Sequence, residues 1–162
     1  MPRFHVLVAH DYLRFCAAHF IAFPGFREPL HGHNYQLTVA VSGPLGPDGF
    51  VLDFCVVQDI AKRLCGELHD RVLLPGRSDA LQLTADETSV ALVAEDGARF
   101  LFPRADVQIL PIVHTSAEEI AAHLLTRFRE GLQVAIAGRG PLEIEVSVAE
   151  APGQVAHCRA AL

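Results

Sequence analysis

Two histidines, His31 and His33, lie two positions apart in the segment HGHNY. If this segment is a β-strand, both imidazoles project from one face, about 6.5–7 Å apart along the backbone, and one metal ion reaches both. His19 ends the segment FCAAHF, and a neighbouring antiparallel strand would bring it in as a third nitrogen ligand. Three neutral imidazoles leave a coordination position open, as in catalytic zinc sites. The alternative reading of HGH is a polar turn followed by the start of a strand.

The cysteines show a different pattern, because no two of them form a CxxC pair. Their scatter indicates free thiols in a reducing compartment, with neither a disulfide framework nor a thiolate zinc site. Cys16 lies three residues before His19, on the opposite face of the same strand, and is not expected to join the histidines. The four positions are Cys16, Cys55, Cys65 and Cys158.

Strands and helices must position these side chains. Residues 4–23 predict one long strand that ends at Pro24-Gly25, and residues 31–42 predict the next strand of a hairpin. Turn residues fill positions 43–49 before an extended run resumes at 50–52. Asp53 is suited to cap a helix, and apolar residues at helical spacing predict that helix over 54–68.

The second half of the chain predicts further hairpins and a second helix. Asp96-Gly97 is a turn signal between two apolar runs, and the strand VQILPI follows. Ser116 and Glu119 fit a capping box that opens a helix over 116–132, with Gly131 placed to help close it. The last strand alternates apolar and polar residues from Leu142 onward. This order predicts an α+β domain, an antiparallel sheet with two helices on one face.

Composition narrows the class of protein. With 162 residues, 51% of them hydrophobic, the chain is expected to form a single domain over residues 1–162 with a sizeable core. A formal net charge of −6 and a single lysine do not suit a protein that binds nucleic acid or an anionic membrane. Neither a membrane-spanning run nor a signal sequence is recognised, so a soluble cytoplasmic protein is expected.

Five ordered motifs together resemble the 6-pyruvoyltetrahydropterin synthase and 6-carboxytetrahydropterin synthase family. The resemblance implies a tunnelling fold (T-fold), in which a four-stranded antiparallel sheet carries two helices. It also implies trimers that form a barrel, commonly paired as hexamers, with active sites between subunits, and zinc on His19, His31 and His33. The motifs are FCAAHF (15–20), LHGHNY (30–35), GFVLDF (49–54), SAEEIA (116–121) and VAEAPGQ (148–154).

The resemblance also implies a pterin-binding set. Glu150 of VAEAPGQ matches the carboxylate that anchors the pterin through its 2-amino and ring N–H groups. Ser116 and Glu118, at the start of SAEEIA, match residues that border the pterin, although capping alone explains Ser116. Arg27 and Arg71 are candidates to offset the acidic net charge near a phosphorylated substrate.

The chain departs from the resembled synthases at their reactive cysteine. Arg27 occupies that position, four residues before His31, and Glu28 follows it to give the spacing ExxHGH. This spacing resembles a branch in which glutamate replaces cysteine and the side chain of a dihydroneopterin phosphate is cleaved to 6-hydroxymethyl-7,8-dihydropterin. The reaction would be a retro-aldol cleavage with Glu28 as the base. An exposed loop charge is the alternative for Glu28.

Two further departures bear on function. The family usually reads Asp-His after its first helix, whereas this chain reads His69-Asp70, so their acid/base role competes with that of a simple helix end. Residues from about 88 to 110 are expected to form an inserted hairpin. Two alternatives therefore stay open: a 6-carboxy- or 6-pyruvoyl-tetrahydropterin synthase, and a pterin-binding protein without turnover. The histidines without an assigned role are His5, His10, His114, His123 and His157.

Overall fold

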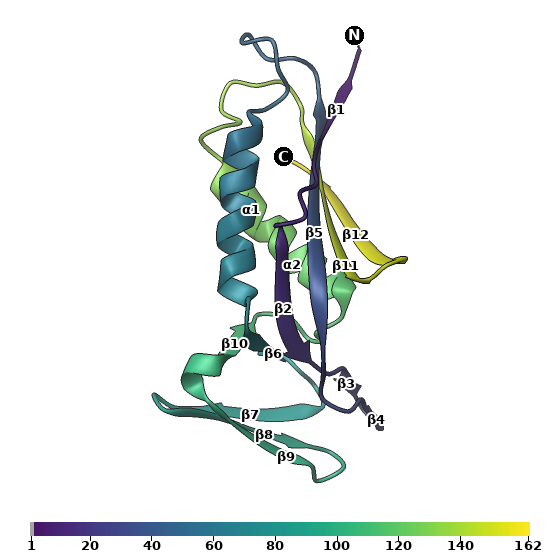
Figure 1. Cartoon of the computed structure of the whole chain (residues 1–162), viewed down its shortest axis with the longest axis vertical. Helices are drawn as coiled ribbons and strands as arrows, with labels where there is room; N and C mark the ends of the chain where they lie inside the picture. Colours follow the sequence, from purple (N-terminus) through teal and green to yellow (C-terminus); the bar gives the residue numbers. More distant parts are fainter. Residues whose placement is uncertain (1) are drawn as a thin grey trace.

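A computed structural model describes residues 2–162 of the chain. A long mixed β-sheet carries two helices, and a smaller sheet lies at one end (Figure 1). The central strand of the long sheet, β5, carries His31 and His33. Within residues 2–162 the order of that sheet is β10 (Val107–Leu110), β6 (Arg71–Pro75), β2 (Arg14–His19), β5 (His31–Gly43), β11 (Glu143–Ala151) and β12 (Gln154–Ala161), and β1 (Phe4–Val8) also pairs with β5.

The single strand predicted over residues 4–23 is wrong, because the chain leaves the sheet between β1 and β2. Both strands pair with β5, β1 along residues 39–43 and β2 along residues 31–36. Six residue steps separate Val8 from Arg14, whereas only three separate their partners on β5, so the extra residues form a loop. Leu13 is fully buried in this loop and continues the alternation of apolar residues. The hydrophobic pattern therefore does not show that the strand is interrupted there.

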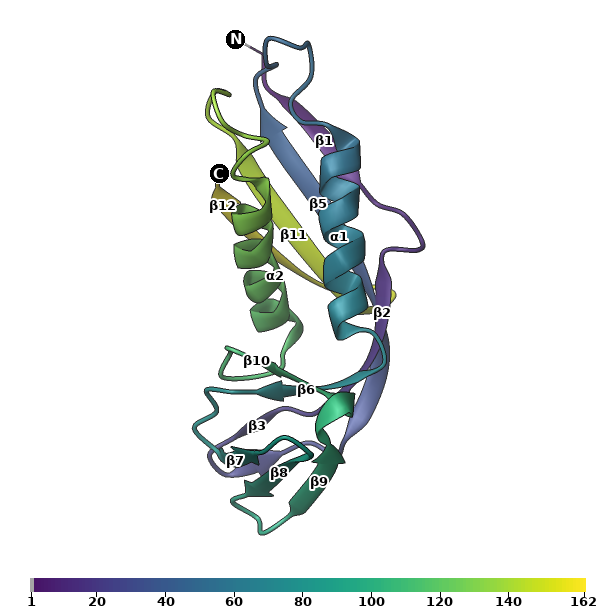
Figure 2. The same ribbon diagram turned by 90° about the vertical axis from the view of Figure 1, so that its left-hand side faces the viewer.

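Helices α1 (Phe54–Leu68) and α2 (Ala117–Leu132) form where the sequence predicts them and cover one face of the long sheet (Figure 2). The Asp53 side chain accepts a hydrogen bond from the Cys55 backbone N–H at 2.8 Å. Ser116 Oγ accepts one from the Glu119 N–H at 3.3 Å. Both predicted N-caps are thus confirmed.

Gly131 has a different role from the one expected, because it is the second-last residue of α2 and the C-cap is Gln133. A Cβ atom at this position would lie 3.1 Å from Ile60 Cδ1 on α1. The glycine therefore lets the two helices approach closely, which a larger residue would hinder.

The long sheet is mixed rather than wholly antiparallel. β6 pairs in parallel with both β2 and β10. No further strand was predicted after the one that begins at Leu142, but β12 forms an antiparallel hairpin with β11 and carries Cys158. Residues 50–52, predicted as extended, form bends, although Val51 and Leu52 are buried in the core between the sheet and the helices. The buried face of the last predicted strand is confirmed, with Ile144, Val146 and Val148 fully enclosed.

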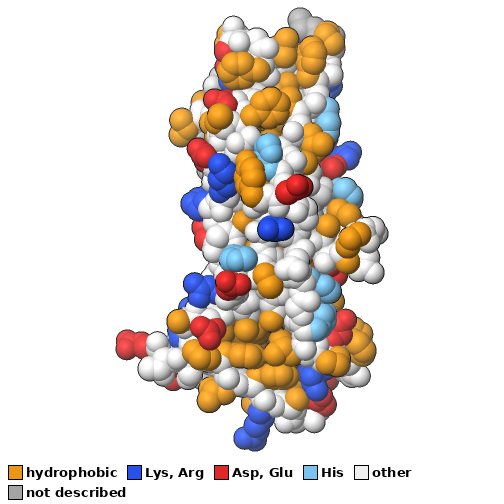
Figure 3. Space-filling view, viewed as in Figure 1, with side chains coloured by type: hydrophobic (Ala, Val, Ile, Leu, Met, Phe, Trp, Pro, Cys, Tyr) orange, Lys and Arg blue, Asp and Glu red, His pale blue; other side chains and the backbone are white. Residues whose placement is uncertain are grey.

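A second sheet lies at the end of the molecule that holds the histidines. It consists of β7 (Leu81–Ala85), β8 (Ser89–Ala94) and β9 (Arg99–Pro103), and we call it the β7–β9 sheet. The Asp96-Gly97 turn joins β8 to β9, as predicted, whereas β7 was not expected. Hydrophobic side chains gather on the surface at this end (Figure 3). A separate core beneath the sheet contains Phe20, Leu74, Val90, Leu92 and Val107.

A short hairpin, β3 (Ala22–Phe23) and β4 (Phe26–Arg27), connects β2 to β5. It leads directly into the segment that carries Glu28. In the part of the chain that the structure describes, α1 and α2 lack the length and apolar character needed to cross a membrane.

Candidate metal centre

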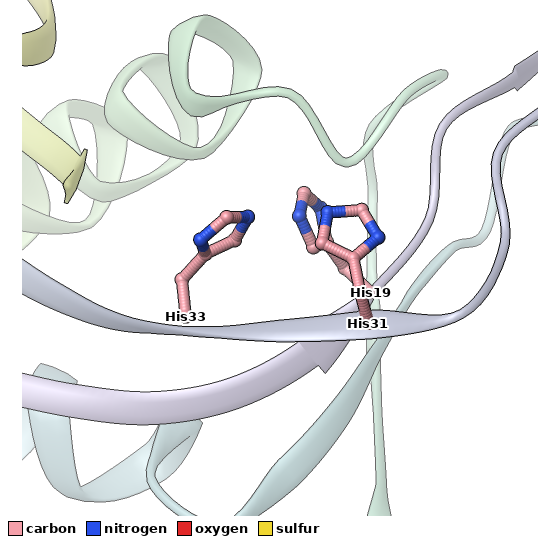
Figure 4. Close-up of side chains that lie close together, drawn as sticks. All are labelled: His19, His31 and His33. Carbon is pink, nitrogen blue, oxygen red and sulfur yellow. The ribbon is translucent and has the colours of Figure 1, made fainter.

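The three predicted histidines converge. His19 at the end of β2 lies opposite His31 in the β2–β5 ladder, and His33 follows two residues along β5 on the same face. Their rings point toward one another (Figure 4), and one nitrogen from each lies within 4.8 Å of the others. The backbone register that the sequence predicts therefore produces a three-nitrogen site that a single metal ion can bridge.

Hydrogen bonds fix which nitrogens face this site. His19 Nδ1 donates to the Thr115 carbonyl at 2.7 Å, and His31 Nδ1 donates to the Pro29 carbonyl at 2.8 Å. Since a carbonyl only accepts, both Nδ1 atoms carry the proton and both Nε2 atoms remain available as ligands. Zinc-bound histidines are held in the same way in proteins generally.

His19 in particular has the properties of a metal ligand. Its side chain is buried, and its Nε2 atom has no hydrogen-bond partner among residues 2–162. Burial, followed by the nearby imidazoles of His31 and His33, lowers the pKa of His19 even though its bond to Thr115 acts in the opposite direction. A neutral imidazole with an unpaired, buried nitrogen fits a zinc ion, which supplies the missing partner.

Glu28 stands beside this group. Its Oε2 accepts a hydrogen bond from the Ile21 N–H at 3.0 Å, and its own N–H donates to the Ile21 carbonyl at 2.9 Å. The half-buried carboxylate acts electrostatically on both His19 and Tyr35. Glu28 is therefore not the exposed loop charge of the alternative reading but a carboxylate held close to the histidines.

Glu150 approaches the histidines from β11. Its Oε1 lies 3.9 Å from His19 Nε2, which is longer than a hydrogen bond, and His19 is neutral, so the contact is not an ion pair. Glu150 lies between a hollow of about 350 Å³, shared with Ser116 and Glu118, and one of about 590 Å³, shared with His33. The three residues predicted to bind the pterin thus border one region next to the histidines.

Arg27 does not point into that region. Its Nε donates to Asp96 Oδ2 at 2.8 Å, and its guanidinium lies over the Phe100 ring, 5.6 Å from the ring centroid. The predicted role of Arg27 in binding substrate is therefore not supported by its geometry, because its charge is paired with the turn between β8 and β9. Sequence spacing gives no sign of this pairing.

His69 and Asp70 are not brought to the histidines within one chain. His69 Nδ1 accepts a hydrogen bond from the Cys16 N–H at 3.0 Å, and the Asp70 N–H donates to the Cys16 carbonyl at 2.8 Å. Asp70 lines a hollow of about 400 Å³ with Cys16 and Gly32, whose positions alternate along the strands with those of the histidines. Both side chains are exposed there, on the opposite face of β2 and β5.

Two functional candidates escaped the sequence analysis. Thr115 orients His19 through its carbonyl and is itself buried, with its hydroxyl donating to the Phe20 carbonyl at 2.9 Å. Tyr35 continues the alternation of His31 and His33 and packs edge-on against His33. Its hydroxyl is buried without a hydrogen-bond partner among residues 2–162, and burial raises its pKa. The alternation of His31, His33 and Tyr35 along one strand could have pointed to Tyr35. No sequence pattern points to Thr115.

The sequence profile of the 6-pyruvoyl tetrahydropterin synthase family matches residues 10–161. The chain belongs to this family. A Methanocaldococcus jannaschii protein, provisionally described as a 6-carboxy-5,6,7,8-tetrahydropterin synthase, is 31% identical over 156 residues, which cover 93% of this chain and 91% of the relative. The Plasmodium falciparum 6-pyruvoyl tetrahydropterin synthase structure is 35% identical, covers 100% of both chains and has a TM-score of 0.94.

A third relative bears on the catalytic group. It is a Plasmodium vivax 6-pyruvoyltetrahydropterin synthase in which a glutamate described as a catalytic residue is replaced by alanine. Its structure is 32% identical to this chain, covers 100% of both chains and has a TM-score of 0.93. The matches confirm the resemblance seen in the sequence and the α+β T-fold, and they assign the chain to a family of pterin-synthesis lyases.

Proposed function

We propose that this synthase-family member is a zinc-dependent enzyme that cleaves the side chain of a 7,8-dihydroneopterin phosphate to 6-hydroxymethyl-7,8-dihydropterin. The observation that carries the proposal is that the three histidines converge and that the Ile21 N–H, two residues after His19, holds the Glu28 carboxylate, three residues before His31. The described catalytic glutamate of the Plasmodium vivax relative supports it.

The metal would be held by His19, His31 and His33. Bound there, zinc supplies a Lewis acid that lowers the pKa of the substrate side-chain hydroxyls. The orientation of the rings suits this role, because a backbone carbonyl accepts from Nδ1 of His19 and of His31, which directs each Nε2 toward the proposed metal.

Glu28 would act as the general base. Its carboxylate takes the proton from a hydroxyl of the substrate side chain. The carbon that carries this hydroxyl becomes a carbonyl as its C–C bond toward the pterin breaks. The carbon that remains attached to the pterin then receives a proton. Because the Ile21 N–H occupies only Oε2, Oε1 remains free to accept the proton.

Glu150, Ser116 and Glu118 would bind the pterin ring. The Glu150 carboxylate can accept two parallel hydrogen bonds from the 2-amino and ring N–H groups, a geometry that carboxylates favour with planar donors. Its Oε1 lies 3.9 Å from His19 Nε2, so a ring anchored by Glu150 would lie next to the proposed metal ligands. A ring anchored there directs its side chain toward Glu28 and the histidines.

His69 and Asp70 would complete the site from a neighbouring subunit of a homo-oligomer, a trimer or hexamer. Two observations support this arrangement. Both residues are exposed, and they lie on the opposite face of the sheet from their own histidines. A second copy of the chain is therefore needed to bring a His69 imidazole to the reacting groups.

The second candidate function is that of a 6-carboxy- or 6-pyruvoyl-tetrahydropterin synthase. The Methanocaldococcus jannaschii relative, with 31% identity, favours the carboxy-forming reaction. The position of Arg27 argues against it, because Arg27 occupies the place of the reactive cysteine in the resembled synthases and is paired with Asp96.

The test is to incubate the zinc-loaded protein with dihydroneopterin mono- and triphosphate and identify products by mass spectrometry. We expect 6-hydroxymethyl-7,8-dihydropterin from the wild type and from Glu87→Gln, a matched change at an exposed turn. Glu28→Gln, which keeps the shape but not the base, should be at least 100-fold slower. A 6-carboxy or 6-pyruvoyl product, tight pterin binding without any product, or full activity in Glu28→Gln would each overturn the proposal.

A further inference from the structure

The segment that carries Glu28 is weakly fixed by main-chain hydrogen bonds. β3 and β4 pair only with each other in the part of the chain that the structure describes, through Ala22 with Arg27 and Phe23 with Phe26. No ladder therefore ties this hairpin to either sheet. Its orientation must come from side-chain contacts.

Those contacts come from one turn of the β7–β9 sheet. Glu95 Oε2 accepts a hydrogen bond from the Gly25 N–H at 2.9 Å, at the tip of the hairpin. The adjacent Asp96 Oδ2 accepts from Arg27 Nε and Nη2, each at 2.8 Å, near its base. Two consecutive carboxylates thus hold the hairpin at two points.

Arg27 transmits this contact to the residue beside it. Its Nη1 donates to the Glu28 carbonyl at 3.1 Å, so a single guanidinium joins Asp96 to the Glu28 backbone. The same guanidinium lies over Phe100 of β9, which stacks on Phe20 with ring centroids 5.0 Å apart. The chain is therefore held by the β7–β9 sheet on both sides of the hairpin.

The space between hairpin and turn is open rather than packed. A hollow of about 500 Å³ separates them and is lined by Ala22, Phe26, Ala94, Glu95 and Asp96, among others. Ala22 is buried in the core beneath the β7–β9 sheet, whereas Phe23 and Phe26 at the tip are exposed, so apolar packing holds only one end of the hairpin. The polar contacts of Glu95 and Asp96 hold the rest.

We propose that the Glu95-Asp96 turn is a positioning clamp, in which Asp96 through Arg27 and Glu95 through Gly25 set the place of the Glu28 carboxylate relative to the histidines. Its catalytic consequence rests on the function proposed above for Glu28. The clamp also gives the β7–β9 sheet a role in the reaction, exerted through the position of Glu28.

The clamp and a merely structural contact have different consequences. Ion pairs between groups that water reaches contribute little to stability, so loss of the pair leaves the fold intact. Misplacing a catalytic group by about 1 Å, however, costs roughly 100-fold in rate. Variants of the clamp are therefore expected to unfold at the wild-type temperature but to turn over slowly, with kcat reduced and KM for the pterin unchanged.

The first measurement is hydrogen exchange, which does not depend on activity. Asp96→Asn and Arg27→Gln should each speed the exchange of the Ile21 and Gly25 N–H groups, because both belong to the clamped segment. Glu87→Gln removes a negative charge from the other end of the same sheet and should leave this exchange unchanged. Wild-type exchange in both clamp variants would overturn the clamp, whatever the enzyme catalyses.

The second measurement is a double-mutant cycle in kcat. If Asp96 acts through Arg27, the double variant should be no slower than the slower single variant, and both singles should lose roughly 10- to 100-fold. Additive losses would overturn the clamp. Faster exchange in a protein that forms no 6-hydroxymethyl product would instead support the clamp and remove the function proposed for Glu28.

Discussion

His19 Nε2 lies 3.9 Å from Glu150 Oε1, across the strand β5 that separates β2 from β11. This contact brings a proposed metal ligand and the proposed pterin anchor together although they are far apart in the chain. Because the two residues come from strands on either side of β5, the spacing of the strands would set the distance between a bound pterin ring and the proposed metal.

Glu150→Gln should weaken pterin binding while leaving the metal in place. The amide keeps one acceptor but loses the charge, and hydrogen bonds to a charged group contribute about 1.5–3 kcal/mol, so KM should rise roughly 10- to 100-fold. Steady-state kinetics measures this change, and metal analysis should show unchanged zinc content. An unchanged KM would mean that Glu150 is only a charge at the end of a strand.

His31→Ala should abolish the stabilisation of the protein by zinc. The residue is exposed, so its removal costs the fold little, whereas the site loses one of its three nitrogens. A ligand present at 100 times its Kd stabilises the folded state by about 2.7 kcal/mol, which is seen as a rise in Tm. Thermal unfolding with and without zinc should therefore show a shift in the wild type and none in His31→Ala. His5→Ala is the control and should keep the shift.

Much of the site could be predicted because local rules decide it. Alternation along β5 places His31 and His33 on one face, and the family motif adds His19. The helix caps at Asp53 and Ser116 could also be predicted, because each side chain accepts a hydrogen bond from a backbone N–H no more than three residues away. Such features depend on neighbours in the sequence.

Contacts between residues far apart in the chain could not be predicted from the sequence. Arg27 and Asp96 are 69 residues apart, and neither lies in a pattern that selects the other. The position of the short strand β6 depends on parallel pairing with β2 and β10. No local sequence pattern predicts this pairing. The position of His69 relative to the histidines likewise depends on tertiary arrangement, so sequence reasoning left its role open.

Glu119→Gln should destabilise the protein at neutral pH but not in acid. The Glu119 carboxylate accepts hydrogen bonds from the Val113 N–H at 2.7 Å and from the His114 N–H and Nδ1 at 3.2 and 2.9 Å. Burial acts to raise the pKa of Glu119, but these bonds outweigh it and lower the pKa from its ordinary value of 4.5. The folded state therefore favours the charged form.

The sign of the pH effect follows from that shift. Stabilisation by Glu119 is fully present above pH 4.5, its unfolded value, and is lost as the pH falls through the lower folded value. Urea unfolding at pH 7 should show that Glu119→Gln lowers the free energy of unfolding by about 1–2 kcal/mol. In acid, the free energies of unfolding of the variant and the wild type should become equal. Glu118→Gln, on the exposed side of the same helical turn, should lower the free energy of unfolding by less at pH 7. A gap that widens in acid would contradict the assignment.

Mixed oligomers should reveal whether His69 acts across a subunit boundary. Glu28→Ala and His69→Ala should each be nearly inactive alone, because every site of either oligomer lacks one of the two groups. If Glu28 of one subunit works with His69 of its neighbour, co-expression of differently tagged variants creates sites that contain both groups. Random mixing in a closed ring makes about a quarter of the sites complete. Activity of the purified mixed oligomers should recover to that level, whereas sites formed within one chain would recover none, since each chain still lacks one residue.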